Sequence, residues 1–365
     1  MWRYRDLLPL LPAEASPVTL GEGGTPLLPS GLLDGVDLYL KDETRNPTGS
    51  HKDRALALAA THARFIGAKC MVVVSAGSTG ISNAAYATRA GLPSIAVVGA
   101  GIPAARLAPL SILGSRIISV DAPIDRLFGA VDEIARRRGL YHSSTMRRVN
   151  AIQANAGRTI AYEIVDALGS APDLLVMPAG GGGTLAAIHA GFADLLARGR
   201  IKHIPRLIAV VSANYDNLRV GFRAGPAAKA GFFELPLPAG GPTVLNKIAH
   251  DHAPDGPELL DALWATKGDV KVATEEEAIS AVSAIGGKDG LYVEPSSAVV
   301  WPALQQLRAE GAITAGMKVV AVMTGSGFRE TMSVIDHLPG LRAPIGLAAL
   351  EAALTEAAGD APMPI

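Results

Sequence analysis

The sequence has one cysteine, few aromatic residues and no long apolar run. Among its 365 residues Cys70 is the only cysteine, which excludes an internal disulfide framework and a zinc site built from cysteines. Cys70 lies beside the apolar residues 71–74, so we interpret it as a buried thiol at a strand edge. No apolar stretch is long enough to span a bilayer, and the charged, Pro-rich N-terminus is unlike a signal peptide. We therefore expect a cytoplasmic protein without membrane contact.

Charge of neither sign dominates the chain. The 33 basic and 34 acidic residues are well mixed and leave a net charge of -1. Without a basic stripe or a polybasic segment, the charge pattern indicates neither a nucleic-acid partner nor an anionic membrane. We also expect no metal site, because His189, His203, His250 and His252 show no ligand spacing with acidic or sulfur-bearing residues. We interpret these histidines as structural or solvated.

Aliphatic residues and glycines are abundant, and their order alternates. Hydrophobic residues make up 49% of the chain but aromatics only 5%, which is typical of parallel sheets covered by helices. The patterns predict strands at 36–41, 71–75, 94–98, 116–120, 174–177, 206–212 and 318–323, and helices at 53–66, 79–89, 103–113, 124–138, 159–168, 184–198, 274–285 and 296–310. The predicted fold class is α/β, with two domains that are each an open, mostly parallel twisted sheet flanked by helices.

Four consecutive glycines follow one of the buried strands. Gly180, Gly181, Gly182 and Gly183, with Thr184 after them, open the next helix. Such a junction presents backbone N–H groups and the positive end of the helix dipole to one point, which is typical of a phosphate site. The spacing is not that of a dinucleotide fingerprint, and no lysine follows as in a Walker loop. A merely flexible turn is the weaker alternative.

A lysine occupies another junction. Residues 46–54, NPTGSHKDR, place Lys52 in the first turn of a helix, directly after a Pro/Gly turn. The positive end of the helix lowers the affinity of such an amine for its proton, which suits Schiff-base chemistry. Taken alone, a lysine at a helix start is more often a surface residue, so the surrounding motifs decide its interpretation.

Two further motifs follow the carboxyl ends of strands. Hydroxyl and backbone N–H groups converge at Ser75, Gly77, Ser78 and Thr79, as needed to hold a carboxylate. An ordinary helix N-cap by Ser78 or Thr79 is compatible with that role. Thr324 follows the last predicted strand and lies at the carboxyl edge of the sheet, where ligands of open α/β sheets collect.

Together these motifs resemble those of fold type II pyridoxal-phosphate (PLP) enzymes, the tryptophan-synthase-β family, and most of all its threonine synthase branch. In the family order, residues 20–27 resemble LGEGxTPL, 46–54 resemble NPTGSFKDR, 75–80 resemble SSGNTG, 178–184 resemble the phosphate-cradling glycine loop, and 324–327 resemble TGHG. The resemblance implies PLP bound as a Schiff base to Lys52, with its phosphate at the glycines and its pyridine nitrogen facing Thr324. It also implies a substrate carboxylate at residues 75–79, and a homodimer.

The sequence departs from the family pattern at several positions. Ser78 stands where an Asn lies beside the cofactor phenol oxygen, Ser326 replaces the His of TGHG, and His51 replaces a Phe, as in the tryptophan synthase β branch. Asn150 and Gln153 fall in the segment that binds the substrate phosphate in threonine synthases. Gln153 stands where an Arg is expected, and a Gln cannot supply a charged, bidentate phosphate contact.

The resemblance also implies a division of the chain. We predict a large PLP-binding domain from residues 1–54 and 151–340, a smaller mobile domain from 55–150, and a C-terminal helix and tail from 341–365. Residues 225–257 are rich in Pro, Gly and Ala and are predicted to form irregular surface.

We predict a PLP-dependent lyase or synthase of amino-acid metabolism that acts on a small amino-acid substrate. The first hypothesis is a threonine synthase-like carbon–oxygen lyase, which converts O-phosphohomoserine and water to threonine and phosphate. The second is β-elimination or β-replacement on a serine- or cysteine-like amino acid, of the dehydratase, cysteine-synthase or cysteate-synthase type, which Gln153 favours. A non-catalytic nucleotide or amino-acid sensor on the same fold is an alternative from another class, and it predicts a colourless protein.

Overall fold

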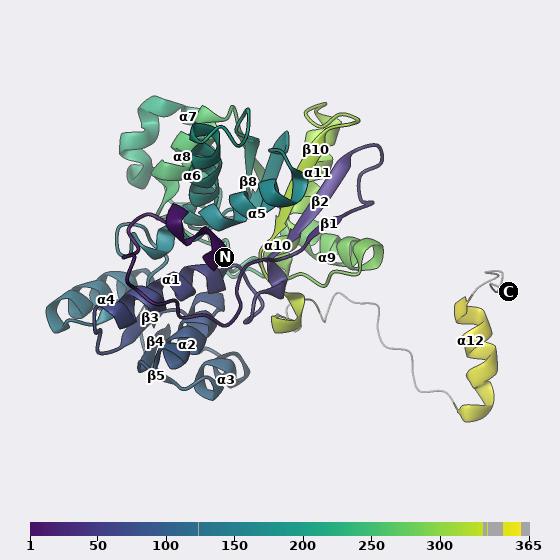
Figure 1. The fold of residues 1–365 in the computed structure, drawn as a ribbon. Coiled ribbons are helices and arrows are strands. Elements are labelled where there is room, and N and C mark those ends of the chain that lie inside the picture. The colour runs from purple at the N-terminus through teal and green to yellow at the C-terminus, as the bar shows by residue number, and fades with distance from the viewer. Residues whose placement is uncertain (123, 331–333, 335–345, 359–365) are drawn as a thin grey trace.

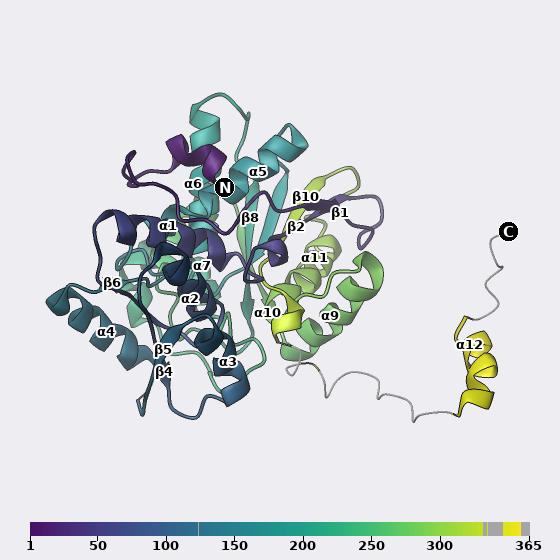
Figure 2. The ribbon, with the colours of Figure 1, turned by 60° about the horizontal axis from the view of Figure 1, so that its bottom comes forward.

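The fold is built on two sheets, seen side by side in Figures 1 and 2. The computed structural model describes residues 1–122, 124–330, 334 and 346–358. The six-stranded sheet has the order β1 (Leu27–Pro29), β2 (Asp37–Asp42), β10 (Lys318–Met323), β7 (Leu174–Pro178), β8 (Arg206–Ser212) and β9 (Asp269–Ala273). The four-stranded sheet has the order β5 (Ser115–Val120), β4 (Ser94–Gly99), β3 (Met71–Val74) and β6 (Tyr141–His142). Every neighbouring pair is parallel except β1 with β2, so the predicted fold class is confirmed.

Helices cover both faces of the larger sheet. One face is packed by α5 (Arg158–Leu168), α6 (Gly183–Ala197), α7 (Asn217–Ala224) and α8 (Gly256–Ala265), and the other by α9 (Glu275–Asp289), α10 (Pro295–Ala298) and α11 (Val300–Ala309). Successive strand residues therefore enter opposite cores: Leu175 and Met177 enter the first, whereas Leu174 and Val176 enter the second. This burial on both faces explains why the strand reads as a continuous apolar run.

The smaller sheet is also covered on both faces: α1 (Lys52–Phe65), α2 (Ser78–Ala90) and α3 (Ala104–Ile112) pack on one, and α4 (Ile124–Arg138) packs on the other. Its strands lie within residues 55–150, and those of the larger sheet lie outside them. The domain boundaries at 54 and 150 themselves stay a prediction. Short 3₁₀ turns complete the chain at η1 (Trp2–Leu7), η2 (Glu43–Arg45), η3 (Gln153–Asn155), η4 (Pro226–Glu234), η5 (Gly327–Arg329) and η8 (Leu347–Ala349).

Residues 225–257 are irregular, as predicted, but the prediction that they form surface is wrong for several of them. The segment has a 3₁₀ turn and loops, but Phe232 and Leu245 are fully buried and Ile248 is 5% exposed. Its apolar residues follow no strand or helix period, because loop backbone packs them one at a time against the helices and the sheet. Periodicity therefore could not reveal their burial.

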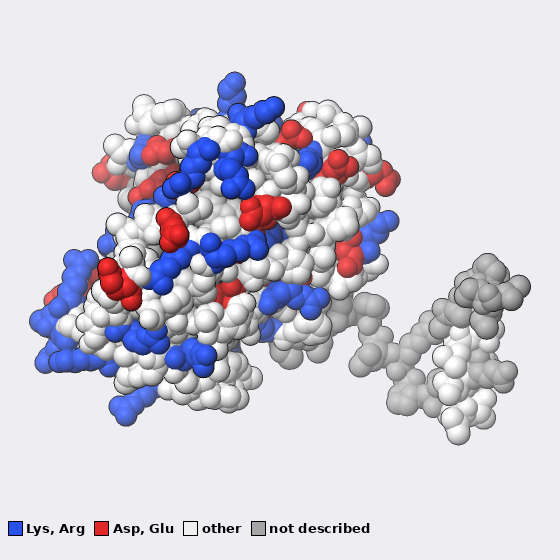
Figure 3. All heavy atoms as spheres, viewed as in Figure 1, with Lys and Arg blue, Asp and Glu red and all other residues white. Residues whose placement is uncertain are grey.

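The C-terminal part contains the helix expected after residue 341, as α12 (Leu350–Ala358), and the predicted tail at 359–365 lies outside the described residues. None of the helices in the described ranges is both long and apolar enough to cross a membrane. The face in Figure 3 carries acidic and basic side chains interspersed, with basic ones gathered over α4, whose last turn holds Arg136, Arg137 and Arg138. The homodimer and the cytoplasmic location stay predictions.

Candidate functional site

A cavity of about 550 Å³ lies where the N-termini of α1, α2 and α6 converge, within the size range of small-molecule sites. It brings together almost all the residues that the sequence singles out. Its wall includes Lys52, Ser75, Gly77, Ser78, Thr79, Gln153, Gly180, Gly181, Gly182, Gly183, Thr184 and Thr324. Asn150 is the exception: its side chain donates to His142 O and accepts from the Gln153 N–H, outside the cavity wall.

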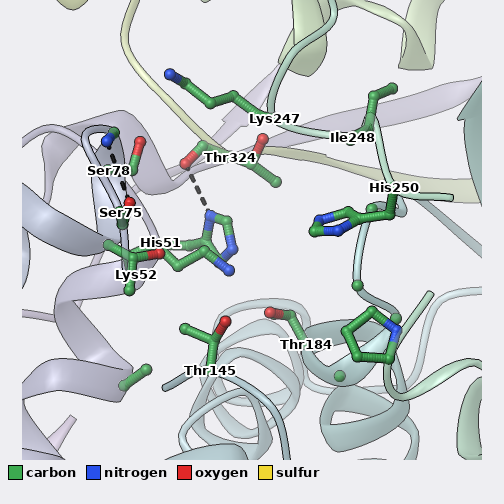
Figure 4. A pocket seen from close by; sticks show the side chains of 18 of the residues that line it. His51, Lys52, Ser75, Ser78, Thr145, Thr184, Lys247, Ile248, His250 and Thr324 are labelled. Atoms are coloured by element: carbon green, nitrogen blue, oxygen red, sulfur yellow. Dashed lines mark hydrogen bonds between the residues drawn. The ribbon is translucent and has the colours of Figure 1, made fainter. Parts of the chain in front are cut away.

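Lys52 begins α1 and extends its amine into the cavity (Figure 4). Burial lowers the pKa of this amine from 10.5 to about 8, and the nearby carboxylates of Asp255 and Glu294 oppose that effect by favouring the ammonium. The amine therefore loses its proton at about pH 8, so a fraction of it is neutral near pH 7 and can act as a nucleophile or base.

The residues after Lys52 fix the start of the helix. Asp53 is fully buried, and its carboxylate accepts hydrogen bonds from the Thr48 N–H at 2.6 Å, the Thr48 hydroxyl at 2.6 Å and the Ser82 hydroxyl. These bonds tie the turn before the helix to α2. The position of Lys52 is therefore set by the buried polar contacts of the residue that follows it.

Arg54 anchors the same turn to the larger sheet through a buried ion network. Its guanidinium donates to Glu43 at 2.7 Å and to Glu163 at 2.7 Å, and Lys41 also donates to Glu163 at 2.7 Å. Burial disfavours the charge on Arg54, but the two carboxylates outweigh it and raise its pKa. All four side chains are at least 98% buried, so each charge depends on the others for compensation.

The glycines after β7 form a close-fitting cradle at the N-terminus of α6. A Cβ on Gly180 would lie 2.7 Å from Lys247 O, and one on Gly183 would collide with Asp255 Oδ2. Gly182 has a φ of +86°, in the left-handed region that favours glycine. Three of the glycines are therefore required by space or by conformation, and their N–H groups lie at the positive end of a 15-residue helix.

The loop after β3 is equally tight. A Cβ on Gly80 would collide with Ser75 O, and the Gly77 N–H donates to Ser75 Oγ at 3.1 Å. Ser78 opens α2, and its hydroxyl accepts from Arg329 Nη1 at 3.2 Å. The loop thus presents the first turn of a helix and several hydroxyls to the cavity, as a carboxylate site requires.

Thr324 faces the cavity from the end of β10. Its N–H donates to Ser297 Oγ at 2.7 Å, and its carbonyl accepts from the His51 N–H at 3.0 Å. His51 Nδ1 lies 3.1 Å from the same carbonyl (Figure 4), which can only accept, so this ring nitrogen carries the proton. Burial, together with the charge of Lys52, lowers the pKa of His51 to about 3, which keeps the ring neutral.

Gln153 is buried and oriented by one backbone contact. Its Nε2 donates to Ser144 O, so the amide oxygen Oε1 points the other way. Oε1 is buried and has no hydrogen-bond partner among the described residues. The cavity wall therefore offers a neutral acceptor at the position where the sequence comparison expects a cation.

Sequence reasoning missed Arg106 in α3 and four further functional groups in the wall: Lys247, His250, Asp255 and Glu294. Three come from residues 225–257, and the fourth precedes α10. His250 was interpreted as structural or solvated, yet its ring lines the cavity across from Lys52 (Figure 4), and burial lowers its pKa to about 4. No periodic pattern marks these positions. Only the charges of Asp255 and Glu294, each beside a Pro, could have indicated them, and no such signal accompanies Lys247.

The cavity fits PLP on three independent features. The glycine cradle would accept its phosphate, the amine of Lys52 would react with its aldehyde, and the hydroxyl of Thr324 would lie toward its ring nitrogen. The cradle is the most specific of the three features, because a Cβ at Gly180 or Gly183 would collide with its wall.

Comparison with known proteins agrees with this fit. A family model described as "Pyridoxal-phosphate dependent enzyme" matches residues 18–325. The threonine synthase of Methanocaldococcus jannaschii is 31% identical over 342 residues, covering 92% of this chain and 82% of the relative. That of Mycobacterium leprae is 32% identical over 345 residues, covering 93% and 90%. The solved structure of an O-ureido-L-serine synthase shares the fold with a TM-score of 0.70 at 21% identity, covering 90% of this chain and 96% of that one.

Proposed function

The chain belongs to the family of pyridoxal-phosphate dependent enzymes, and from this premise we propose that it is a threonine synthase-like carbon–oxygen lyase. Its substrates would be O-phosphohomoserine and water, and its products threonine and inorganic phosphate. Relatives named threonine synthase that align over more than nine-tenths of the chain support the proposal. The observation that carries it is that one cavity wall contains the Lys52 amine together with two cations, Lys247 and Arg106.

The motif residues would hold the cofactor. Gly180 to Gly183 and Thr184 would bind its phosphate through backbone N–H groups, and the hydroxyl of Thr324 would bind its ring nitrogen. Ser78 would lie beside its phenol oxygen. When bound, PLP supplies an electron sink for negative charge that develops on the substrate carbon chain.

Lys52 would move the protons of the reaction. With a pKa of about 8, its amine is partly neutral near pH 7 and can take the proton from the substrate Cα. The ammonium that results can return a proton further along the carbon chain. A hydroxyl at the ring nitrogen, rather than a carboxylate, favours elimination and replacement over transamination.

Substrate recognition would use both walls of the cavity. Ser75, Ser78 and Thr79 would bind the α-carboxylate at the first turn of α2. A Cβ on Gly77 would lie 3.3 Å from Lys247 Nζ, so this cation lies against the carboxylate loop. Arg106 lies on the same side of the cavity as Lys247, because it donates to the neighbouring Asn246 at 3.2 Å.

These cations would supply the attraction for a second anionic group that Gln153 does not. Lys247 and Arg106 both contact Glu330, and the Glu294 carboxylate also lies near Lys247. A phosphate at the far end of the substrate would bind these two cations in competition with the carboxylates.

The test is turnover of O-phosphohomoserine by the purified holoenzyme. Release of inorganic phosphate together with threonine, both abolished in Lys52→Ala, is the expected result. Absence of phosphate release from a coloured, PLP-loaded protein would refute threonine synthase activity while leaving the family membership intact.

A second function, β-elimination or β-replacement on a serine- or cysteine-like amino acid, is favoured by Gln153. Its unpartnered Oε1 could accept a hydrogen bond from a neutral donor on a shorter substrate, and it would repel a phosphate oxygen. Pyruvate or a β-substituted alanine formed from serine, O-acetylserine or O-phosphoserine would establish this activity. Gln153→Arg should then lower turnover of those substrates.

A further inference from the structure

The phosphate cradle contains a carboxylate. Asp255 occupies the N-cap position of α8, but its side chain does not cap that helix. Its N–H donates to Gly181 O at 2.9 Å, and its Oδ2 lies where a Cβ of Gly183 would be. Asp255 thus turns away from its own helix and toward the N-terminus of α6.

The Asp255 carboxylate is buried and only half satisfied. The residue is 3% exposed and lines the cavity. Its Oδ1 accepts from the Arg147 N–H at 2.9 Å, whereas its Oδ2 accepts no hydrogen bond from the part of the chain that the structure describes. Because Asp255 lines the cavity beside an anion-binding helix terminus, its Oδ2 is placed to contact a ligand atom there.

The charges that face Asp255 do not neutralise it. Arg147 and Lys52 favour its ionised form, and Glu258 opposes it. Within the described residues none of these forms an ion pair with it, and Arg147 contacts it through the backbone. Burial is the dominant effect and raises the pKa of Asp255 to about 6.

A phosphate dianion in the same cradle adds negative charge next to this carboxylate. Two like charges that share a buried site cannot both stay ionised without a large cost, and they retain a proton between them. The N–H groups of the glycines satisfy only part of the phosphate, which has three oxygens that accept hydrogen bonds.

We propose that Asp255 holds a proton whenever the cofactor phosphate occupies the glycine cradle, and donates it in a hydrogen bond to a phosphate oxygen. The proton is taken from solvent, so cofactor binding at neutral pH consumes one proton. This role concerns the cofactor and is independent of which amino acid the enzyme converts.

The test measures proton uptake directly. The probe is pyridoxamine 5′-phosphate, which has no aldehyde, bound to the full chain in a Lys52→Ala background so that this lysine neither reacts nor titrates. Calorimetric titration at pH 7 in buffers of different ionisation enthalpy gives the number of protons taken up. Asp255→Asn, with an amide of the same shape, is compared with Glu258→Gln, which removes a similar charge at an exposed position three residues along.

The parent and Glu258→Gln should take up about one proton more than Asp255→Asn. Between pH 6.5 and 7.5 their dissociation constants should also increase by a factor about ten times larger than the factor for Asp255→Asn. Equal uptake and equal pH slopes in all three proteins would overturn the proposal. Should Asp255→Asn fail to fold, as judged by circular dichroism, the parent decides: uptake near zero at pH 7 overturns the proposal, and about one proton supports it.

Discussion

Lys52 should accept PLP at a rate that rises with pH and levels off above about pH 8. Covalent attachment needs the neutral amine, and burial lowers the pKa of this amine from 10.5 to about 8. At pH 7 about one molecule in ten then carries the neutral form, against about one in 3,000 for an ordinary lysine. The rate at pH 7 should therefore exceed that of an exposed lysine by about 300-fold through this effect alone.

The assay follows the visible absorbance after apoprotein is mixed with PLP between pH 6 and 10. We expect the rate to increase about tenfold per pH unit at the acid end, to reach half its maximum at about pH 8 and to become constant above about pH 9. Glu294→Gln sharpens the test, because the Glu294 carboxylate favours the ammonium of Lys52. Its removal should move the plateau to lower pH.

Glu258→Gln is the matched control, since Glu258 is not among the charges that act on Lys52. It should leave the plateau where it is in the wild type. A rate that keeps rising to pH 10 would show that the amine behaves as a solvated lysine, and the reasoning from burial would then fail. If Glu258→Gln and Glu294→Gln shift the plateau equally, the effect of the Glu294 carboxylate on the pKa of Lys52 is refuted.

Three further perturbations test other parts of the site. Glu163→Gln should lower the free energy of unfolding by about 3–5 kcal/mol in a urea titration, because it removes a carboxylate that compensates the buried charges of an arginine and a lysine. Asp261→Asn, at an exposed ion pair, should lower it by under about 1 kcal/mol. Gly180→Ala should weaken PLP binding by about 1–3 kcal/mol in a fluorescence titration, whereas Gly181→Ala, whose Cβ would lie 3.5 Å from its nearest neighbour, should bind nearly normally. Lys247→Ala should raise the KM for O-phosphohomoserine roughly tenfold at an unchanged dissociation constant for PLP, and equal changes in both would contradict its role toward substrate.

Residues with a strong local pattern could be predicted from the sequence. The strands at 206–212 and 318–323 have their predicted bounds, because short runs of β-branched residues between polar ends favour a strand over any other structure. The strand β9 was missed, since five residues that include Asp269 and Lys271 carry too weak a signal. The glycine cradle was found because its residues are consecutive in the chain, and what they surround became visible only in three dimensions.

The two sets of site residues differ in how they arise. The groups that would bind the cofactor lie on helix N-termini and strand ends, where a few backbone geometries fix them and leave a motif in the sequence. Of the groups that would meet the far end of the substrate, Lys247 lies in irregular backbone and leaves no motif, whereas Gln153 begins η3 and is marked only by its departure from the family pattern. Replacing one such group changes which substrate is bound without disturbing the cradle. A threonine synthase-like scaffold can therefore carry Gln153 in place of an arginine and keep its cofactor, so substrate identity has to be measured on Lys247 and Gln153 variants rather than inferred from the motifs.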